Sequence, residues 1–158
     1  MTSTLEILNA ANIQFLRNYP LFITWQTSTQ SIATGTPVAL TWPAAQVDTY
    51  TGWSVSNPTR YTGKVGGYYE FNASYASAAN ATGDHVIFLV KNGVTASPIA
   101  STAVTAASAS DNPSIQVSAI IQLNGSTDYV EAWVVQRSGG ALVTAVTLTS
   151  MNAIMIHE

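Results

Sequence analysis

Apolar and polar residues alternate with a period of two along most of the chain. In the stretch GGYYEFNASY (66–75), one set of alternating positions carries Tyr69, Phe71, Ala73 and Tyr75, and the other carries Tyr68, Glu70, Asn72 and Ser74. Successive side chains of a β-strand point to opposite faces of its sheet. The pattern therefore predicts a strand with one face in the core and the other in water.

Short segments of this kind follow one another from Leu21 onward, separated by turn residues such as Asn92-Gly93 and Asn124-Gly125. The clearest are 21–27, 37–42, 60–65, 67–78, 84–93, 114–125, 128–137 and 144–158. Such spacing predicts an all-β sandwich or barrel. The weakly patterned segment 94–110 is either an edge strand, with Pro98 confined to the edge, or a long connection.

A helical period is found only near the start of the chain. Leucine and other apolar residues recur at three- and four-residue spacing over 4–18, Thr4 can cap the segment, and Pro20 ends it. We divide the chain into an N-terminal helical segment (1–19) and a β-domain (20–158). The helix either docks on its own domain or attaches the domain to a larger assembly, and its candidate attachment residues are Leu5, Leu8, Phe15 and Leu16.

Two of the expected strands are apolar on both faces. In 86–90, Ile87 and Leu89 oppose three apolar side chains, and in 129–135, Val130 and Val134 do the same. A sandwich has one interior, and a monomer seldom exposes a large apolar patch. A subunit interface is one explanation for the second apolar face, and a cover of loops or of the N-terminal helix is the other.

The chain carries few charges. Asp, Glu, Lys and Arg make up 8% of its 158 residues and the net charge is −3, whereas soluble domains usually carry about 25% charged residues. No basic stripe is present that could neutralise phosphates. The longest apolar run, VIFLV (86–90), is far shorter than the roughly 20 residues that span a bilayer. We therefore expect neither a nucleic-acid partner nor membrane insertion.

Residues suited to catalysis are sparse. The chain has no cysteine, and neither His85 nor His157 has another histidine at metal-ligand spacing. The eight carboxylates are scattered, and Asp84 and Asp128 stand at strand starts where they can accept turn amides. We therefore expect no enzyme activity, no catalytic residue, no metal and no cofactor.

Aromatic residues cluster in the loop-like segment WPAAQVDTYTGWS (42–54). Exposed aromatic rings can stack on a sugar ring, which makes Trp42, Tyr50 and Trp53 candidates for ligand contact. The alternative use of these rings is core packing or an interface.

Five blocks of the sequence together resemble the C1q/TNF-like jelly roll found in bacteriophage virion proteins. They are VDTYTGWS (47–54), RYTGKVGGYYEF (60–71), HVIFLVKNG (85–93), IQLNGSTDYVEAWV (121–134) and SMNAIMI (150–156). The shared features are a G-x-Y-x-F pattern ending at Phe71, an Asn-Gly strand end, an L-x(4)-D-Y-V pattern ending at Val130, and an apolar last strand. The leading LNAANIQFLRNYP also looks like the helix that precedes this domain in small phage tail-associated proteins.

The resemblance implies a two-sheet jelly roll of ten strands, preceded by a short helix, that assembles as a homotrimer. Aromatic and aliphatic side chains would lie along its three-fold axis. The residues placed in the core or the trimer interface are Tyr69, Phe71, Phe88, Tyr129, Val130 and Trp133.

The function that follows is that of a non-enzymatic virion structural protein. Made in the cytoplasm of a host bacterium, it would be fixed to the phage tail or fibre through residues 1–19. A capsid decoration protein is the second interpretation. A third is an adhesin that binds host surface glycans through the loops at 42–54, 79–84 or 124–127, and a glycan hydrolase acting across a trimer seam is the least favoured.

Overall fold

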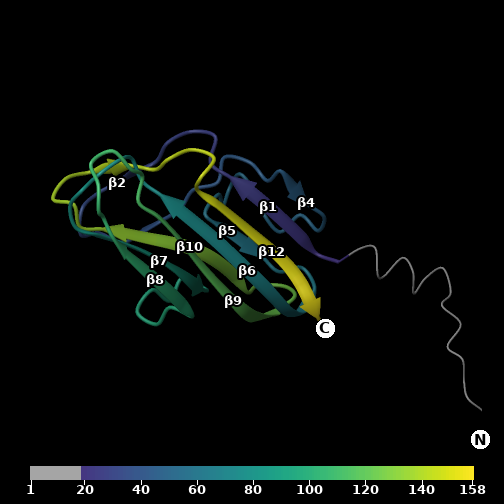
Figure 1. Cartoon of the computed structure of the whole chain (residues 1–158). Coiled ribbons are helices and arrows are strands. Elements are labelled where there is room, and N and C mark those ends of the chain that lie inside the picture. Colours follow the sequence, from purple (N-terminus) through teal and green to yellow (C-terminus); the bar gives the residue numbers. More distant parts are fainter. Residues whose placement is uncertain (1–18) are drawn as a thin grey trace, which may run out of the picture.

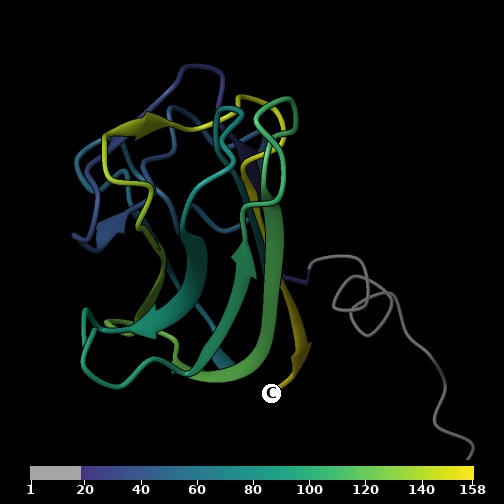
Figure 2. The same ribbon diagram turned by 60° about the vertical axis from the view of Figure 1, so that its left-hand side comes forward.

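Two antiparallel sheets form a sandwich in the computed structural model, which describes residues 19–158. The first sheet has the order β4 (Val47–Asp48), β1 (Leu21–Trp25), β12 (Ser150–His157), β6 (Gly66–Ala76), β9 (Ser114–Asn124). The second has the order β3 (Val38–Ala39), β10 (Tyr129–Gln136), β7 (Asp84–Lys91), β8 (Ala100–Thr105), and β5 (Arg60–Thr62) also pairs with β10. Figure 1 shows β1, β12, β6 and β9 side by side, and Figure 2 shows the two layers from another side.

The prediction of an all-β, two-sheet fold is confirmed. Residues 19–158 contain no helix, and in that range nothing helical is long and apolar enough to cross a membrane. The expected helix over 4–18, with its attachment residues Leu5, Leu8, Phe15 and Leu16, lies outside the described residues.

Strand β6 places its alternating side chains as the sequence predicts. Tyr69, Phe71 and Tyr75 are fully buried and Ala73 is buried with them, while the alternate positions of the strand lie on the outer face. The strand pairs along its whole length with β9 and over most of its length with β12. Its inward side chains therefore form the middle of the core, which they share with residues of the second sheet such as Ile87 and Val134.

A glycine is required where β6 begins. Gly67 has a φ of +151°, and a Cβ at this position would collide with the backbone oxygen of His157 and the side chain of Met155. The close approach coincides with a register shift between Met155 and His157 in β12. Any side chain at Gly67 would therefore force the ends of these two strands apart.

Both apolar faces of β7 and β10 are covered within the single chain. Ile87, Leu89, Val130 and Val134 are fully buried in the main core. On the opposite face, a second cluster buries Phe88, Val90 and Val135, with Val86 and Trp133 packed against it. The two-sided pattern of these strands thus does not by itself require a subunit interface.

Segment 94–110 contains the edge strand β8 of the second sheet, preceded by Pro98. The two-residue strands β2 (Ser31–Ile32), β4 and β11 (Leu142–Val143) were not predicted individually. Strands this short carry no alternation that a sequence pattern can reveal.

Replacing Phe71 with alanine should lower the free energy of unfolding by about 3–5 kcal/mol, because it leaves a ring-sized cavity in the core. Denaturant unfolding followed by circular dichroism, at one protein concentration, measures the effect. Val55, which is 79% exposed, provides the control: Val55→Ala should change stability by no more than about 0.5 kcal/mol. A loss below about 1 kcal/mol for Phe71→Ala would contradict its role in the core.

Candidate functional site

The outer face of the first sheet exposes an unusual number of large apolar side chains. Tyr68 is 43% exposed, Ile120 61%, Ile154 41% and Ile156 44%. Three neighbouring strands, β12, β6 and β9, carry them. This outer face is the most apolar exposed surface on either sheet, and it is our candidate interaction surface.

The strand register arranges this surface in rows. Ile154 of β12 and Ile120 of β9 both pair with Glu70 of β6, and Leu21 of β1 pairs with Ile154 on the other side. One row across four strands is therefore apolar except for a single carboxylate. The next two rows are polar in their middle, with Asn152, Asn72 and Ser118 in one and Ser150, Ser74 and Gln116 in the other.

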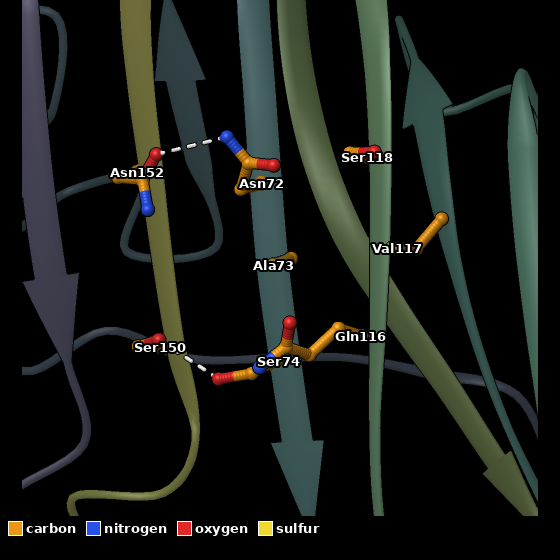
Figure 3. A pocket seen from close by; sticks show the side chains of 8 residues that line it. All are labelled: Asn72, Ala73, Ser74, Gln116, Val117, Ser118, Ser150 and Asn152. Atoms are coloured by element: carbon orange, nitrogen blue, oxygen red, sulfur yellow. Dashed lines mark hydrogen bonds between the residues drawn. The ribbon is translucent and has the colours of Figure 1, made fainter.

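The polar rows form a shallow hollow of about 200 Å³, shown in Figure 3. Within it, the Asn72 side-chain amide donates to Asn152 Oδ1 at 3.3 Å, and the hydroxyls of Ser74 and Ser150 lie 2.8 Å apart. Gln116 extends a longer side chain from β9 toward Ser74 (Figure 3). The hollow offers hydrogen-bonding groups but no charge. Such a surface is better suited to contact with another polypeptide than to a catalytic reaction.

The six residues that the resemblance placed in the core or trimer interface occupy two different positions. Tyr69, Phe71 and Val130 lie fully buried in the main core. Phe88 and Trp133 stack on the outer face of the second sheet with ring centroids 6.5 Å apart, and Tyr129 lies half-buried on the same strand as Trp133. Sequence reasoning missed Ile120, Ile154 and Ile156 as candidates, although each occupies a polar-side position of an alternating strand, which is the available signal.

The aromatic segment 42–54 divides between core and surface. Trp42 is fully buried in the main core, so its assignment as a ligand contact is corrected. Tyr50 and Trp53 are half-buried. The carboxylate of Asp48 accepts the backbone N–H groups of Gly52 at 3.0 Å and Trp53 at 2.8 Å, and so holds this loop in place.

A second ordered loop spans 124–128. Asn124 Oδ1 accepts the backbone N–H groups of Ser126, Thr127 and Asp128, each at 3.0 Å. The Asp128 carboxylate in turn accepts from Lys91 Nζ at 2.8 Å and from the Asn92 side-chain amide at 2.8 Å.

These contacts favour the charged form of Asp128. The Lys91 ammonium, followed by the Asn92 amide, holds the pKa of that carboxyl below its ordinary value of 3.8. The loop therefore depends on an ionised Asp128 for its attachment to the end of β7.

The two kinds of residue on which a metal or acid–base site could be built, histidine and carboxylate, form no cluster of three within residues 19–158. His85 is fully buried beside Tyr75, with ring centroids 6.1 Å apart, and neither of its ring nitrogens has a hydrogen-bond partner there. Burial lowers the pKa of His85, so the ring is neutral at neutral pH. No three His, Cys, Asp or Glu side chains of the described part come together as metal ligands would.

Comparison with solved structures identifies the fold as a TNF-like jelly roll. Murine APRIL at pH 5.0 matches with a TM-score of 0.64 and 9% identity, over 87% of this chain and 99% of that one. Eiger TNF from S. frugiperda matches with a TM-score of 0.63 and 10% identity, over 89% and 94% of the two chains. No protein-family model and no curated protein sequence matches the chain. At such low identity the likeness establishes the fold alone.

Replacing Asp128 with asparagine should destabilise the protein by roughly 1 kcal/mol at pH 7, because charge-assisted hydrogen bonds at a partly exposed site are lost. A carboxyl whose folded pKa is lowered contributes stability above its unfolded pKa and loses it as pH falls through the folded value. The difference between wild type and Asp128→Asn should therefore be constant above the ordinary pKa of 3.8 and shrink below it. Urea unfolding at a series of pH values tests this, and a difference that persists unchanged in acid would contradict it.

Proposed function

We propose that the protein is a non-enzymatic structural protein of a bacteriophage virion. It forms a homotrimer through the outer face of its first sheet, and residues 1–19 fix it to the tail or fibre so that the β-domain points outward. The observation that carries the proposal is the TNF-like jelly roll, with exposed isoleucines gathered on one sheet face.

The apolar rows on that face favour assembly. A monomer would leave Ile120, Ile154, Ile156 and Tyr68 in water on adjacent strands. Association removes this area from water at a gain of about 25 cal/mol per Å². The polar rows beside it can form hydrogen bonds across the interface, which gives the association a fixed geometry.

The phage assignment is supported by the sequence resemblance described above, whose blocks fall on strands and loops of the jelly roll. RYTGKVGGYYEF covers β5 and the first half of β6, and SMNAIMI covers most of β12. The low charge and abundant hydroxyl side chains suit a module that stays folded outside a cell. A capsid decoration protein would share these properties and differ only in its docking partner.

Light scattering of the purified chain should give a mass near three times 16.7 kDa. Ile120→Glu should reduce the mass to that of one chain, because it places a second carboxylate beside Glu70 on a face that assembly would remove from water. Val55→Glu places the same charge on an exposed valine of the loop before β5 and should leave the trimer intact. A monomeric wild type, or a trimer that tolerates Ile120→Glu, would overturn the assignment of this face.

Deleting residues 1–18 should leave a folded trimer that no longer joins the virion. The cut falls before Tyr19 because Thr49 Oγ1 donates to the Tyr19 carbonyl and Met155 N to that of Pro20. The measurement is mass spectrometry of virions from host cells that express the tagged chain, with tagged Val55→Glu as the incorporated control. Incorporation of the truncated protein would refute attachment through this segment. Immunogold labelling of the incorporated chain separates tail from capsid.

A further inference from the structure

A cleft of about 330 Å³ lies where the two ordered loops meet. Its lining comes from three parts of the chain: the loop 51–57, β5 with Lys64, and residues 126–129. Hydroxyl and amide side chains line much of it, namely Thr51, Ser54, Asn57, Thr62, Ser126 and Thr127. Both loops are held by the backbone hydrogen bonds to Asp48 and Asn124 described above, so the walls are built before any ligand arrives.

The cationic side chains of the described residues that form no ion pair both line this cleft. Among residues 19–158, Lys91 pairs with Asp128 and Arg137 pairs with Asp84, whereas Arg60 and Lys64 form no ion pair. Both unpaired cations line the cleft, and no carboxylate does. The lining of the cleft therefore presents two cationic side chains and no anionic one.

The carboxylates nearest in sequence and strand register are engaged elsewhere. Glu131, which pairs with Arg60 across β5 and β10, accepts from Thr59 Oγ1 at 2.6 Å and from Trp133 Nε1 at 3.0 Å. Asp48 accepts the loop N–H groups. Neither carboxylate neutralises the guanidinium of Arg60 through an ion pair.

Arg60 is fixed in position but uses none of its side-chain donors. Its guanidinium carbon lies 4.4 Å from the centroid of the Tyr129 ring, a cation–π contact that orients the group. Its buried Nε has no hydrogen-bond partner within the described residues. An arginine carries five N–H donors in a planar fork that matches a carboxylate. The guanidinium of Arg60 therefore presents donors that no hydrogen bond within residues 19–158 occupies.

Trp53 adds an aromatic surface to the same cleft. Its indole Nε1 donates to the Pro58 carbonyl at 3.4 Å, which keeps the ring at the cleft wall. An indole face packs well against the C–H groups of a sugar, and hydroxyl and amide side chains can bind the sugar hydroxyls. A ring surface, hydroxyl-binding groups and two unpaired cations are therefore present together.

We propose that this cleft binds an acidic saccharide, with the sugar carboxylate on Arg60 and Lys64 and the sugar ring against Trp53. The volume suits one or two sugar units. The carboxylate forms charge-assisted hydrogen bonds with the guanidinium, and the ring places its hydroxyls toward Ser54, Asn57 and Thr127. All the residues that the proposal uses belong to one chain.

The test uses the full chain and a matched pair of ligands, the sodium salt of methyl glucuronide and its neutral counterpart methyl glucoside. Saturation-transfer difference NMR titrations at low ionic strength measure affinity. The glucuronide should bind, and the glucoside should bind about tenfold or more weakly, since a charge-assisted hydrogen bond contributes at least that much. Arg60→Gln and Lys64→Gln should each lower glucuronide affinity by about tenfold, while Arg137→Gln, which removes the same charge elsewhere, should not.

Three outcomes would overturn the proposal. Equal binding of the glucoside would show that charge plays no part, and unchanged binding in both cleft variants would place the ligand elsewhere. Inorganic phosphate, added as a competitor, distinguishes a general anion site: displacement of the glucuronide by phosphate at equal concentration would remove the role of the sugar. Light scattering of the same samples reports assembly separately, so failure of the cleft proposal and failure of the trimer proposal are distinguishable.

Discussion

The pairing of β6 with β9 and β12 is the constraint on which the rest of the structure depends. Its antiparallel register decides which side chains of three strands enter the core and which reach the surface. A slip of one residue would turn Phe71 outward and Glu70 inward, at the cost of the main aromatic cluster. At the start of β6 this register also requires a glycine at position 67, because a Cβ there would collide with the end of β12.

The same register creates the candidate interaction surface. Ile120 and Ile154 both pair with Glu70. The register that turns the apolar side chains of the three strands into the core therefore also aligns these two isoleucines in one row on the outer face. The second sheet behaves differently, because its outer face closes over Phe88, Val90 and Val135 within one chain. The two sheets thus differ, because the second buries apolar side chains of its outer face within one chain and the first leaves an apolar row exposed.

Most of the few carboxylates in the described part of the chain have hydrogen-bond or ion-pair partners. Carboxylates at Asp48 and Asp128 fix loops by accepting N–H groups or pairing with Lys91. As a result, Arg60 and Lys64 remain without ion-pair partners in the described part of the chain, at the place where those two loops converge. With so few charges in the chain, the pairing of each one determines where unpaired charge lies in the described structure.

The sequence by itself determined the all-β class, the long strands and the inward faces of β6 and β9. A two-residue alternation is a local property, so it can be recognised from neighbouring residues without knowledge of contacts between distant segments. Only the tertiary structure decided that Trp42 enters the core, that both faces of β7 are covered from within, and that Ile120 stays exposed. It also brought residues 51–57 together with residues 126–127, a juxtaposition that depends on packing between segments about 70 positions apart. Burial and clefts of this kind arise from which sheets and loops meet in space, and alternation along one strand carries no information about its neighbours.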